Sequence, residues 1–237
     1  MIWAFDVDGT LTPSRQLMDQ DFKAWFMRWC KTRRVVLVTG SDYVKTSEQV
    51  GHDLAEAVER VHCCAGNSVW EAGREVWHNE WQPDRKLLDI LDWMLHASIY
   101  PERCGVHEEF RPGMLNFSIV GRNCTLEQRQ AYHAWDQQHG ERAHLCSIIT
   151  RMFPELDAQV GGEISIDIFP RGRDKSQLRE YYANEPMTFF GDGIEPGKND
   201  WPLASLLTAP SQAVSVKGWQ DTLAVLRPTG TPLKTTA

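Results

Sequence analysis

The chain has no long apolar run, no excess of positive charge and no paired cysteine motif. No stretch approaches the roughly 18 to 20 apolar residues that a membrane-spanning helix needs, and Met1 to Phe5 run into Asp6 without the features of a signal peptide. Its 25 basic and 32 acidic residues give a formal net charge of −7, which argues against binding nucleic acid by neutralising phosphates. These absences predict a soluble protein that has neither a membrane nor nucleic acid as its partner.

The six cysteines contain no Cys-x-x-Cys pair; they are Cys30, Cys63, Cys64, Cys104, Cys124 and Cys146. This usage fits reduced thiols in a cytosolic setting better than a disulfide framework or a zinc site. We therefore expect free cysteines and a cytoplasmic location. With 237 residues and a hydrophobic content of 42%, the chain is long enough for one large domain or two modest ones.

Two carboxylates, Asp6 and Asp8, follow a short apolar run at the start of the chain. This spacing suits an aspartyl-phosphate site, because one carboxylate can attack phosphorus while the second handles the proton of the leaving or attacking oxygen. Gly9 then permits a sharp turn. A calcium loop is the alternative, but such a loop needs a glutamate at its twelfth position, which is Leu17 here.

Short apolar runs predict buried strands at residues 2–5, 35–38, 187–190 and 213–216. Aromatic residues at helical spacing between 22 and 29 predict the buried stripe of an amphipathic helix. Residues 69–77 indicate a β-hairpin that turns at Ala72-Gly73, and a helix is predicted over 85–97. Alternating patterns at 114–120 and 164–169 predict half-buried antiparallel strands, with a largely helical span between them.

Strand–helix alternation at both ends, with an antiparallel middle, predicts an α/β domain interrupted by an inserted α+β domain. Residues suited to hinges stand at Gln82-Pro83 and at Pro170-Arg171-Gly172. We therefore predict a core in two parts, residues 1–81 and 171–227, built on a parallel sheet. The inserted domain, residues 82–170, has an antiparallel sheet, and residues 228–237 are expected to form a frayed tail.

Polar residues follow three of the predicted strands, and a lysine opens a predicted helix: Asp6 and Asp8, Thr39 and Ser41, Lys175, and Asp192 with Asp200. Ligands of an open parallel sheet bind beyond the carboxyl ends of its strands, so these side chains are expected to converge. The hydroxyl of Thr39 or Ser41, the Lys175 ammonium and a divalent cation can then neutralise a phosphoryl group in transfer. Asp6 and Asp192 are oxygen donors suited to Mg²⁺, and Asp200 is placed to orient its waters.

In this order, the segments 6–10, 38–41, 174–175 and 191–200 resemble the four motifs of the haloacid dehalogenase superfamily. More narrowly, the chain resembles the eukaryotic-type α-phosphomannomutases from about Ile2 to Leu226, including the stretches 109–116, 121–122 and 161–170. The resemblance implies a Rossmann-like core with a mobile cap of the C2b type and interconversion of mannose 6-phosphate and mannose 1-phosphate, with glucose phosphates as further candidates. It also implies Mg²⁺ on Asp6, Asp8, Asp192 and Asp200, a hexose 1,6-bisphosphate activator, and a homodimer through the cap.

Carried over position by position, the resemblance makes Asp6 the nucleophile and Asp8 the general acid/base. It makes substrate-binding groups of Arg15, Arg111, Asn116, Arg122, Arg129, Ser165 and Asp167, with the cap arginines on the distal phosphate and the last two residues on sugar hydroxyls. Arginine forks suit bidentate binding of phosphate. Ser165 and Asp167 stand two apart on a predicted strand and therefore on one face, which without the resemblance is explained as well by a solvated strand face.

The chain departs from the family at Thr39, where the family usually has glycine and superfamily phosphatases more often have threonine. Three functions stay open: a phosphohexomutase, a sugar-phosphate phosphatase that lets water reach the aspartyl-phosphate, and a non-catalytic sugar-phosphate binding protein. Arg111, Arg122 and Arg129 separate the first two, because a mutase needs a second phosphate anchor while its sugar reverses.

Overall fold

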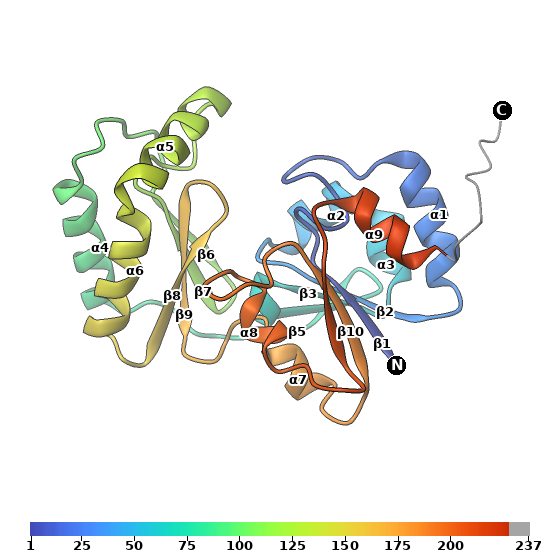
Figure 1. Ribbon diagram of the computed structural model, residues 1–237. Coiled ribbons are helices and arrows are strands. Elements are labelled where there is room, and N and C mark those ends of the chain that lie inside the picture. Colours follow the sequence, from blue (N-terminus) through green and yellow to red (C-terminus); the bar gives the residue numbers. More distant parts are fainter. Residues whose placement is uncertain (228–237) are drawn as a thin grey trace.

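The computed structural model describes residues 1–227, so the tail predicted over 228–237 lies outside the described residues. These residues form two lobes, each built on its own β-sheet (Figure 1). The strands of the larger sheet are, in spatial order, β11 (Gln212–Ser215), β10 (Met187–Gly191), β1 (Ile2–Phe5), β2 (Arg34–Val38), β3 (Arg60–Cys63), β4 (Ser68–Glu71) and β5 (Arg74–His78). Those of the smaller sheet are β6 (Glu108–Arg111), β7 (Met114–Phe117), β9 (Ser165–Pro170) and β8 (Leu156–Gly161).

Helices flank both sheets. In the larger lobe they are α1 (Gln20–Cys30), α2 (Tyr43–Val50), α3 (His52–Ala57), α7 (Gln177–Tyr181), α8 (Trp201–Ala204) and α9 (Trp219–Leu226). In the smaller lobe they are α4 (Arg85–Ala97), α5 (Leu126–His139) and α6 (Glu141–Met152). The bounds of α4 match the helix predicted over 85–97, and α5 and α6 fill much of the span predicted to be helical.

The larger sheet is parallel from β11 to β3, and its four predicted apolar strands are confirmed to within one residue at each end. The predicted hairpin is confirmed as β4 and β5, which extend the sheet as an antiparallel pair. Ala72 and Gly73 at its tip both have positive φ, as a tight hairpin turn requires. The fold is therefore the predicted mixed α/β class, with a mostly parallel sheet and a separate antiparallel one.

Side chains of the parallel strands alternate between two apolar clusters. Phe5, Leu37 and Phe190 lie in a cluster with residues of α1, α3 and α9, whereas Ala4 and Phe189 lie in one with residues of α7 and α8. The sheet is thus covered on both faces, which explains why its strands read as continuous apolar runs. The predicted aromatic stripe of α1 is part of this core, since the ring of Phe26 meets that of Phe5 at a centroid distance of 5.1 Å.

The smaller sheet has one apolar and one polar face. Leu115 and Phe117 on β7, and Ile166 and Ile168 on β9, pack in one cluster with residues of α4, α5 and α6. The side chains between them in sequence point to the opposite face, because successive strand residues alternate. The strand predicted over 114–120 is too long. β7 ends at Phe117 because Ser118 turns the chain, its hydroxyl donating to the Ile164 carbonyl and accepting from the Gly121 N–H.

Both connections between the lobes meet at Asn67. Asn79, just after β5, donates from its side chain to the Asn67 Oδ1 (2.9 Å), and the Asn67 Nδ2 donates to the carbonyl of Arg173, just after β9 (2.7 Å). Asn67 thereby holds the two connecting segments against the end of the larger sheet. The division at 81/82 and 170/171 stays a prediction.

All six cysteines are free, as predicted, and burial raises the pKa of the Cys30, Cys64 and Cys146 thiols to about 12. Such thiols are poor nucleophiles, which makes them packing residues. Within residues 1–227, no helix is long and apolar enough to cross a membrane.

A buried histidine predicts acid sensitivity of the fold. Burial, assisted by the charge of Arg60, lowers the pKa of His62 to about 3, so the folded protein holds it neutral while the unfolded chain takes up a proton below about pH 6.5. Stability is therefore lost as the pH falls from about 6.5 toward about 3, by about 1.4 kcal/mol per pH unit. We expect the free energy of unfolding in urea to fall about 2 kcal/mol more in the wild-type protein than in a His62→Gln variant between pH 7 and pH 5. Equal losses in the two proteins would contradict this.

Candidate active site

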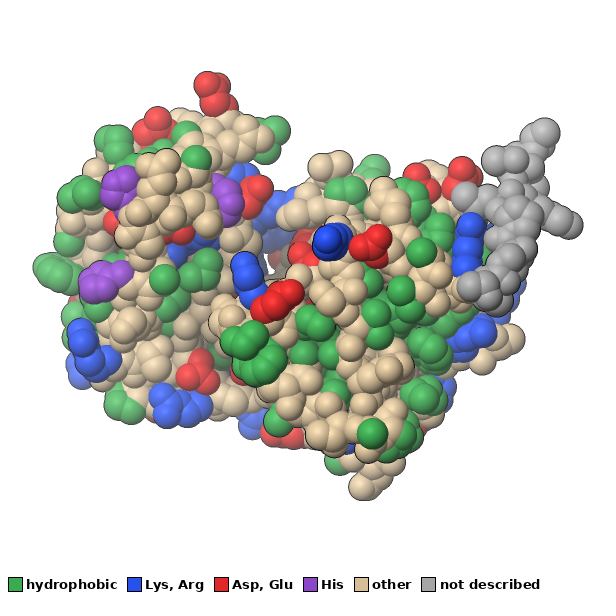
Figure 2. Space-filling model, viewed as in Figure 1, with side chains coloured by type: hydrophobic (Ala, Val, Ile, Leu, Met, Phe, Trp, Pro, Cys, Tyr) green, Lys and Arg blue, Asp and Glu red, His purple; other side chains and the backbone are tan. Residues whose placement is uncertain are grey.

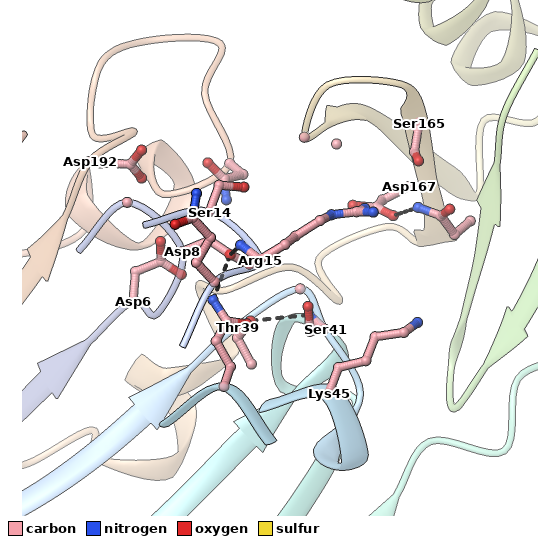
Figure 3. A pocket seen from close by; sticks show the side chains of 18 of the residues that line it. Asp6, Asp8, Ser14, Arg15, Thr39, Ser41, Lys45, Ser165, Asp167 and Asp192 are labelled. Atoms are coloured by element: carbon pink, nitrogen blue, oxygen red, sulfur yellow. Dashed lines mark hydrogen bonds between the residues drawn. The ribbon is translucent and has the colours of Figure 1, made fainter. Parts of the chain in front are cut away.

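A cavity of about 630 Å³ lies between the two lobes. Figure 2 shows it as a hollow between the lobes, with basic and acidic side chains around its mouth. The loops after β1 and β2 form one wall, and strands of the smaller sheet form the other (Figure 3). The predicted residues that line it are Asp6, Asp8, Arg15, Thr39, Ser41, Arg111, Asn116, Arg122, Ser165, Asp167 and Asp192. Lys175, Asp200 and Arg129 are buried and do not line it.

The loop after β1 presents Asp6 and Asp8 to the cavity. The Asp6 N–H donates to the Phe190 carbonyl of β10 (2.9 Å), which continues the strand pairing up to the carboxylate. Gly9 follows with a φ of +74°, and a Cβ there would meet the Asp192 carboxylate at 2.3 Å. Glycine is therefore required at this turn both for its backbone conformation and for space.

The loop after β2 contributes Thr39 and Ser41. The Thr39 side chain is buried, and its hydroxyl accepts a hydrogen bond from the Ser41 N–H (3.1 Å). The two residues thus form one compact turn at the carboxyl end of β2, facing Asp6 and Asp8 (Figure 3). Hydroxyl and N–H groups in such a turn are suited to holding phosphate oxygens.

Lys175 forms ion pairs with two of the predicted acidic residues, Asp6 and Asp200. Its ammonium lies 2.5 Å from Oδ1 of Asp6 and 2.5 Å from Oδ1 of Asp200, and all three side chains are almost fully buried. Burial alone would lower the pKa of Lys175, but the two carboxylates outweigh it and raise that pKa above its usual value. Lys175 is therefore a permanently charged group that fixes the Asp6 carboxylate at the end of β1.

Three carboxylates here exceed what one lysine can neutralise. Asp6, Asp192 and Asp200 each offer an oxygen within 4.8 Å of the others. Burial, together with the charges of Asp200 and Asp192, raises the pKa of Asp6 well above its usual range, and burial and Asp200 also raise that of Asp192. Oxygen donors with excess negative charge fit a hard divalent cation. The Asp8 carboxylate, also predicted as a ligand, is not part of this cluster.

Four arginines lie near one another at the cavity: Arg15, Arg111 and Arg122 line it, and Arg129 is buried close to them. Burial and the positive charges of Arg111, Arg15 and Arg129 lower the pKa of Arg122 to about 10, and Glu109 opposes this effect. The pKa of Arg15 is lowered in the same way, by burial and by Arg129 and Arg111. Mutual repulsion among partly desolvated guanidinium groups marks a site that an anion would stabilise.

Glu109 and Lys45 belong to this site although no role was predicted for either. Glu109 Oε2 lies 2.9 Å from Arg111 Nη2 and 2.8 Å from Arg122 Nε, while its Oε1 accepts from Lys45 Nζ of α2 (2.5 Å). Despite partial burial, these cations lower the pKa of Glu109 to about 2. A further bond joins Arg111 Nη1 to the Gly40 carbonyl (3.0 Å). Glu109 thus aims two arginines and ties the smaller lobe to the larger one.

The polar face of the smaller sheet supplies neutral and acidic groups. Asn116 and Asp167 are directly paired on β7 and β9, and the Asn116 Nδ2 donates to Asp167 Oδ1 (2.6 Å). Ser165 lies on the same strand face and accepts from Arg122 Nη1 (3.0 Å). Ser165 and Asp167 therefore point into the cavity beside the arginines, and not into open solvent (Figure 3).

Solved structures of similar fold define the fold class of the chain. An IMP-nucleotidase from Plasmodium falciparum matches with a TM-score of 0.61 at 16% identity, over 95% of this chain and 65% of that one. Sucrose-phosphatase from Synechocystis matches with a TM-score of 0.54 at 15% identity, over 95% and 86% of the two chains. The fold is that of haloacid dehalogenase enzymes with a cap domain.

Sequence comparison narrows this class to one family. The profile described as eukaryotic phosphomannomutase matches residues 22–229. A phosphomannomutase from Dendrobium officinale is 34% identical over 212 residues, 86% of this chain and 84% of that protein, and one from Saccharomyces cerevisiae is 30% identical over 234 residues, 94% and 91% of the two. The chain belongs to the eukaryotic phosphomannomutase family.

The buried lysine predicts a large stability effect. Lys175→Met removes the only cation bonded to Asp6 and Asp200 among the described residues, and leaves two buried carboxylates uncompensated. We expect a loss of about 3–5 kcal/mol in the free energy of unfolding in urea, measured with a chelator present. The matched change Lys45→Met breaks a half-exposed ion pair and should cost less than about 1 kcal/mol. Similar losses in both variants would contradict the account.

Proposed function

We propose that this chain is a phosphomannomutase that carries the transferred phosphoryl group on Asp6. The observation that supports this most directly is that the cavity has two separate sites for anionic groups. One is the turn around Asp6, Thr39 and Ser41 beside Lys175, and the other is the arginine group of the smaller lobe. A sugar with a phosphate at each end matches such a cavity, whereas hydrolysis of a single phosphate needs only the first site.

Each half-reaction is one displacement at phosphorus. An Asp6 oxygen attacks the phosphorus of hexose 1,6-bisphosphate, the bond from phosphorus to the sugar oxygen breaks, and Asp8 gives that oxygen a proton. A monophosphate bound with its free hydroxyl next to Asp6 then attacks the aspartyl-phosphate and gives its proton to Asp8, which restores both side chains and forms the bisphosphate. The bisphosphate reverses in the cavity, so that its other phosphate is the next one transferred. Asp6, Asp192 and Asp200 would hold Mg²⁺, which would neutralise phosphate charge there.

The second anion site allows the reversal. Arg111, Arg122 and Arg129 hold whichever phosphate is not reacting, so the 1- and 6-phosphates exchange places on a common anchor. Asn116, Ser165 and Asp167 lie beside these arginines and bind sugar hydroxyls. Arg15 stands between the two sites, since the charges of both Asp8 and Arg129 act on the pKa of its guanidinium. Mannose and glucose phosphates both meet this description.

The smaller lobe acts as the cap, with residues 82–170 as its span. Closing it removes water, which otherwise competes with the sugar hydroxyl for the aspartyl-phosphate. A homodimer through the cap and a cytoplasmic location complete the proposal, as the resemblance to the family implies. A sugar-phosphate phosphatase is the second candidate, and the observation in its favour is the buried Thr39 where the family usually has glycine.

The function is tested by incubating the protein with Mg²⁺ and mannose 1-phosphate, with and without a trace of hexose 1,6-bisphosphate. We expect mannose 6-phosphate to form when the bisphosphate is present, with little inorganic phosphate released. Inorganic phosphate as the main product in both samples would mean that the protein is a phosphatase. Glucose 1-phosphate in a parallel series measures the preference between the two sugars.

Two variants test the roles of the paired aspartates. Asp6→Asn should abolish turnover and phosphoenzyme formation while the protein still unfolds cooperatively, because no other group replaces the nucleophile. Asp8→Asn should slow mannose 6-phosphate formation by about 10²-fold or more, the scale of a positioned acid/base. Turnover by Asp6→Asn, or an unchanged rate in Asp8→Asn, would assign the corresponding role to another residue.

A further inference from the structure

Gln49 on α2 is the one buried amide that contacts Asp8 among the described residues. Its side chain is 8% exposed, lines the cavity, and donates from Nε2 to Asp8 Oδ1 (2.8 Å) and to Thr12 Oγ1 (2.5 Å). Its backbone carbonyl accepts from the Met18 N–H (2.8 Å). The last turn of α2 is thereby attached at three points to the loop that carries Asp8.

The surroundings of the Gln49 amide determine which way it faces. Thr12 Oγ1 donates its own proton to the Val7 carbonyl (3.3 Å), so it can only accept from its other neighbour. The NH₂ group of Gln49 therefore faces both Thr12 and Asp8, and each of its two protons has an acceptor. An amide held in this way cannot flip without losing both bonds.

Asp8 Oδ1 has a second donor on the other side. The backbone N–H of Arg15 lies 2.7 Å from the same oxygen, and Arg15 has a φ of +57°, a left-handed conformation that non-glycine residues rarely adopt. The loop thus takes up a strained conformation at the residue that points its N–H at Asp8. No hydrogen bond within residues 1–227 engages Oδ2.

The two oxygens of Asp8 are therefore not equivalent. Two N–H donors occupy the lone pairs of Oδ1, whereas Oδ2 has no hydrogen bond among residues 1–227. We propose that Gln49 is a positioning residue for the reaction: it holds Oδ1, and so presents Oδ2 as the oxygen that exchanges a proton with the sugar. This inference rests on the proposed role of Asp8 as the acid/base.

The proposal predicts an effect that depends on the leaving group. A sugar oxygen is a poor leaving group and needs the proton from Asp8 as its bond to phosphorus breaks. 2,4-Dinitrophenyl phosphate releases a stable phenolate that leaves without a proton. Loss of the Gln49 amide should slow phosphoryl transfer from the sugar phosphate and leave transfer from the dinitrophenyl ester unchanged.

The test compares wild type with Gln49→Met, which keeps the length of the side chain but has no N–H. We expect kcat for mannose 6-phosphate formation to fall 10- to 100-fold with KM within about twofold, a part of the acid/base contribution. The first-turnover burst of dinitrophenolate should keep its wild-type rate. Equal loss with both substrates, or no loss with the sugar phosphate, would overturn the proposal.

Two further variants separate positioning from folding. Thr12→Val removes the second acceptor but keeps the hydrogen bond between Gln49 and Asp8, so kcat should fall less than in Gln49→Met. An equal fall in kcat would mean that the effect comes from a changed loop structure and not from the Gln49–Asp8 bond. Val44→Ala, on the exposed face of the same helix, should match wild type in both assays. If the wild-type protein only hydrolyses sugar phosphate, the proposed function fails, and the same ratio measured on hydrolysis still tests Gln49.

Discussion

The site depends on an imbalance of charge at the carboxyl ends of β1 and β10. Three carboxylates, Asp6, Asp192 and Asp200, meet there, and the single ammonium of Lys175 is bonded to two of them. The remaining negative charge suits a divalent cation. A cation bound there would offset this charge and favour the binding of a phosphate at the loop after β1. The parallel sheet makes this possible, because it brings side chains from residues 6, 175, 192 and 200 to one edge with their apolar neighbours packed behind them.

The other wall of the cavity, formed by the smaller lobe, carries an excess of positive charge. Arg15, Arg111 and Arg122 line the cavity with Arg129 buried near them, and the Glu109 carboxylate forms ion pairs with two of the four, Arg111 and Arg122. Because Glu109 also bonds Lys45 of the larger lobe, the residue that organises the arginines also helps to bring the lobes together. One carboxylate therefore contributes both to the contact between the two lobes and to the orientation of the arginines.

Much of this arrangement follows from local patterns in the sequence. The runs at 2–5 and 187–190 are apolar enough to require burial, and the α4 helix is bounded by Asp84, which caps it, and Ser98. The polar edge strand β6, Glu-Glu-Phe-Arg, has no such pattern, so Glu109 and its bonds were not predicted. Gln49 reads as an ordinary polar residue of a surface helix. Its contact with Asp8 depends on how α2 packs across 41 residues of chain, which no local pattern reports.

The central claim, that phosphoryl transfer passes through Asp6, is tested most directly by trapping the phosphoenzyme. The protein is mixed with hexose 1,6-bisphosphate and Mg²⁺, quenched in acid within a turnover, digested with pepsin at acidic pH so that the acyl phosphate survives, and analysed by tandem mass spectrometry. Fragment ions that separate Asp6 from Asp8 in the N-terminal peptides identify the phosphorylated residue. The account predicts one phosphoryl group on Asp6. A phosphoryl group on Asp8 or on any other residue, with none on Asp6, would contradict it.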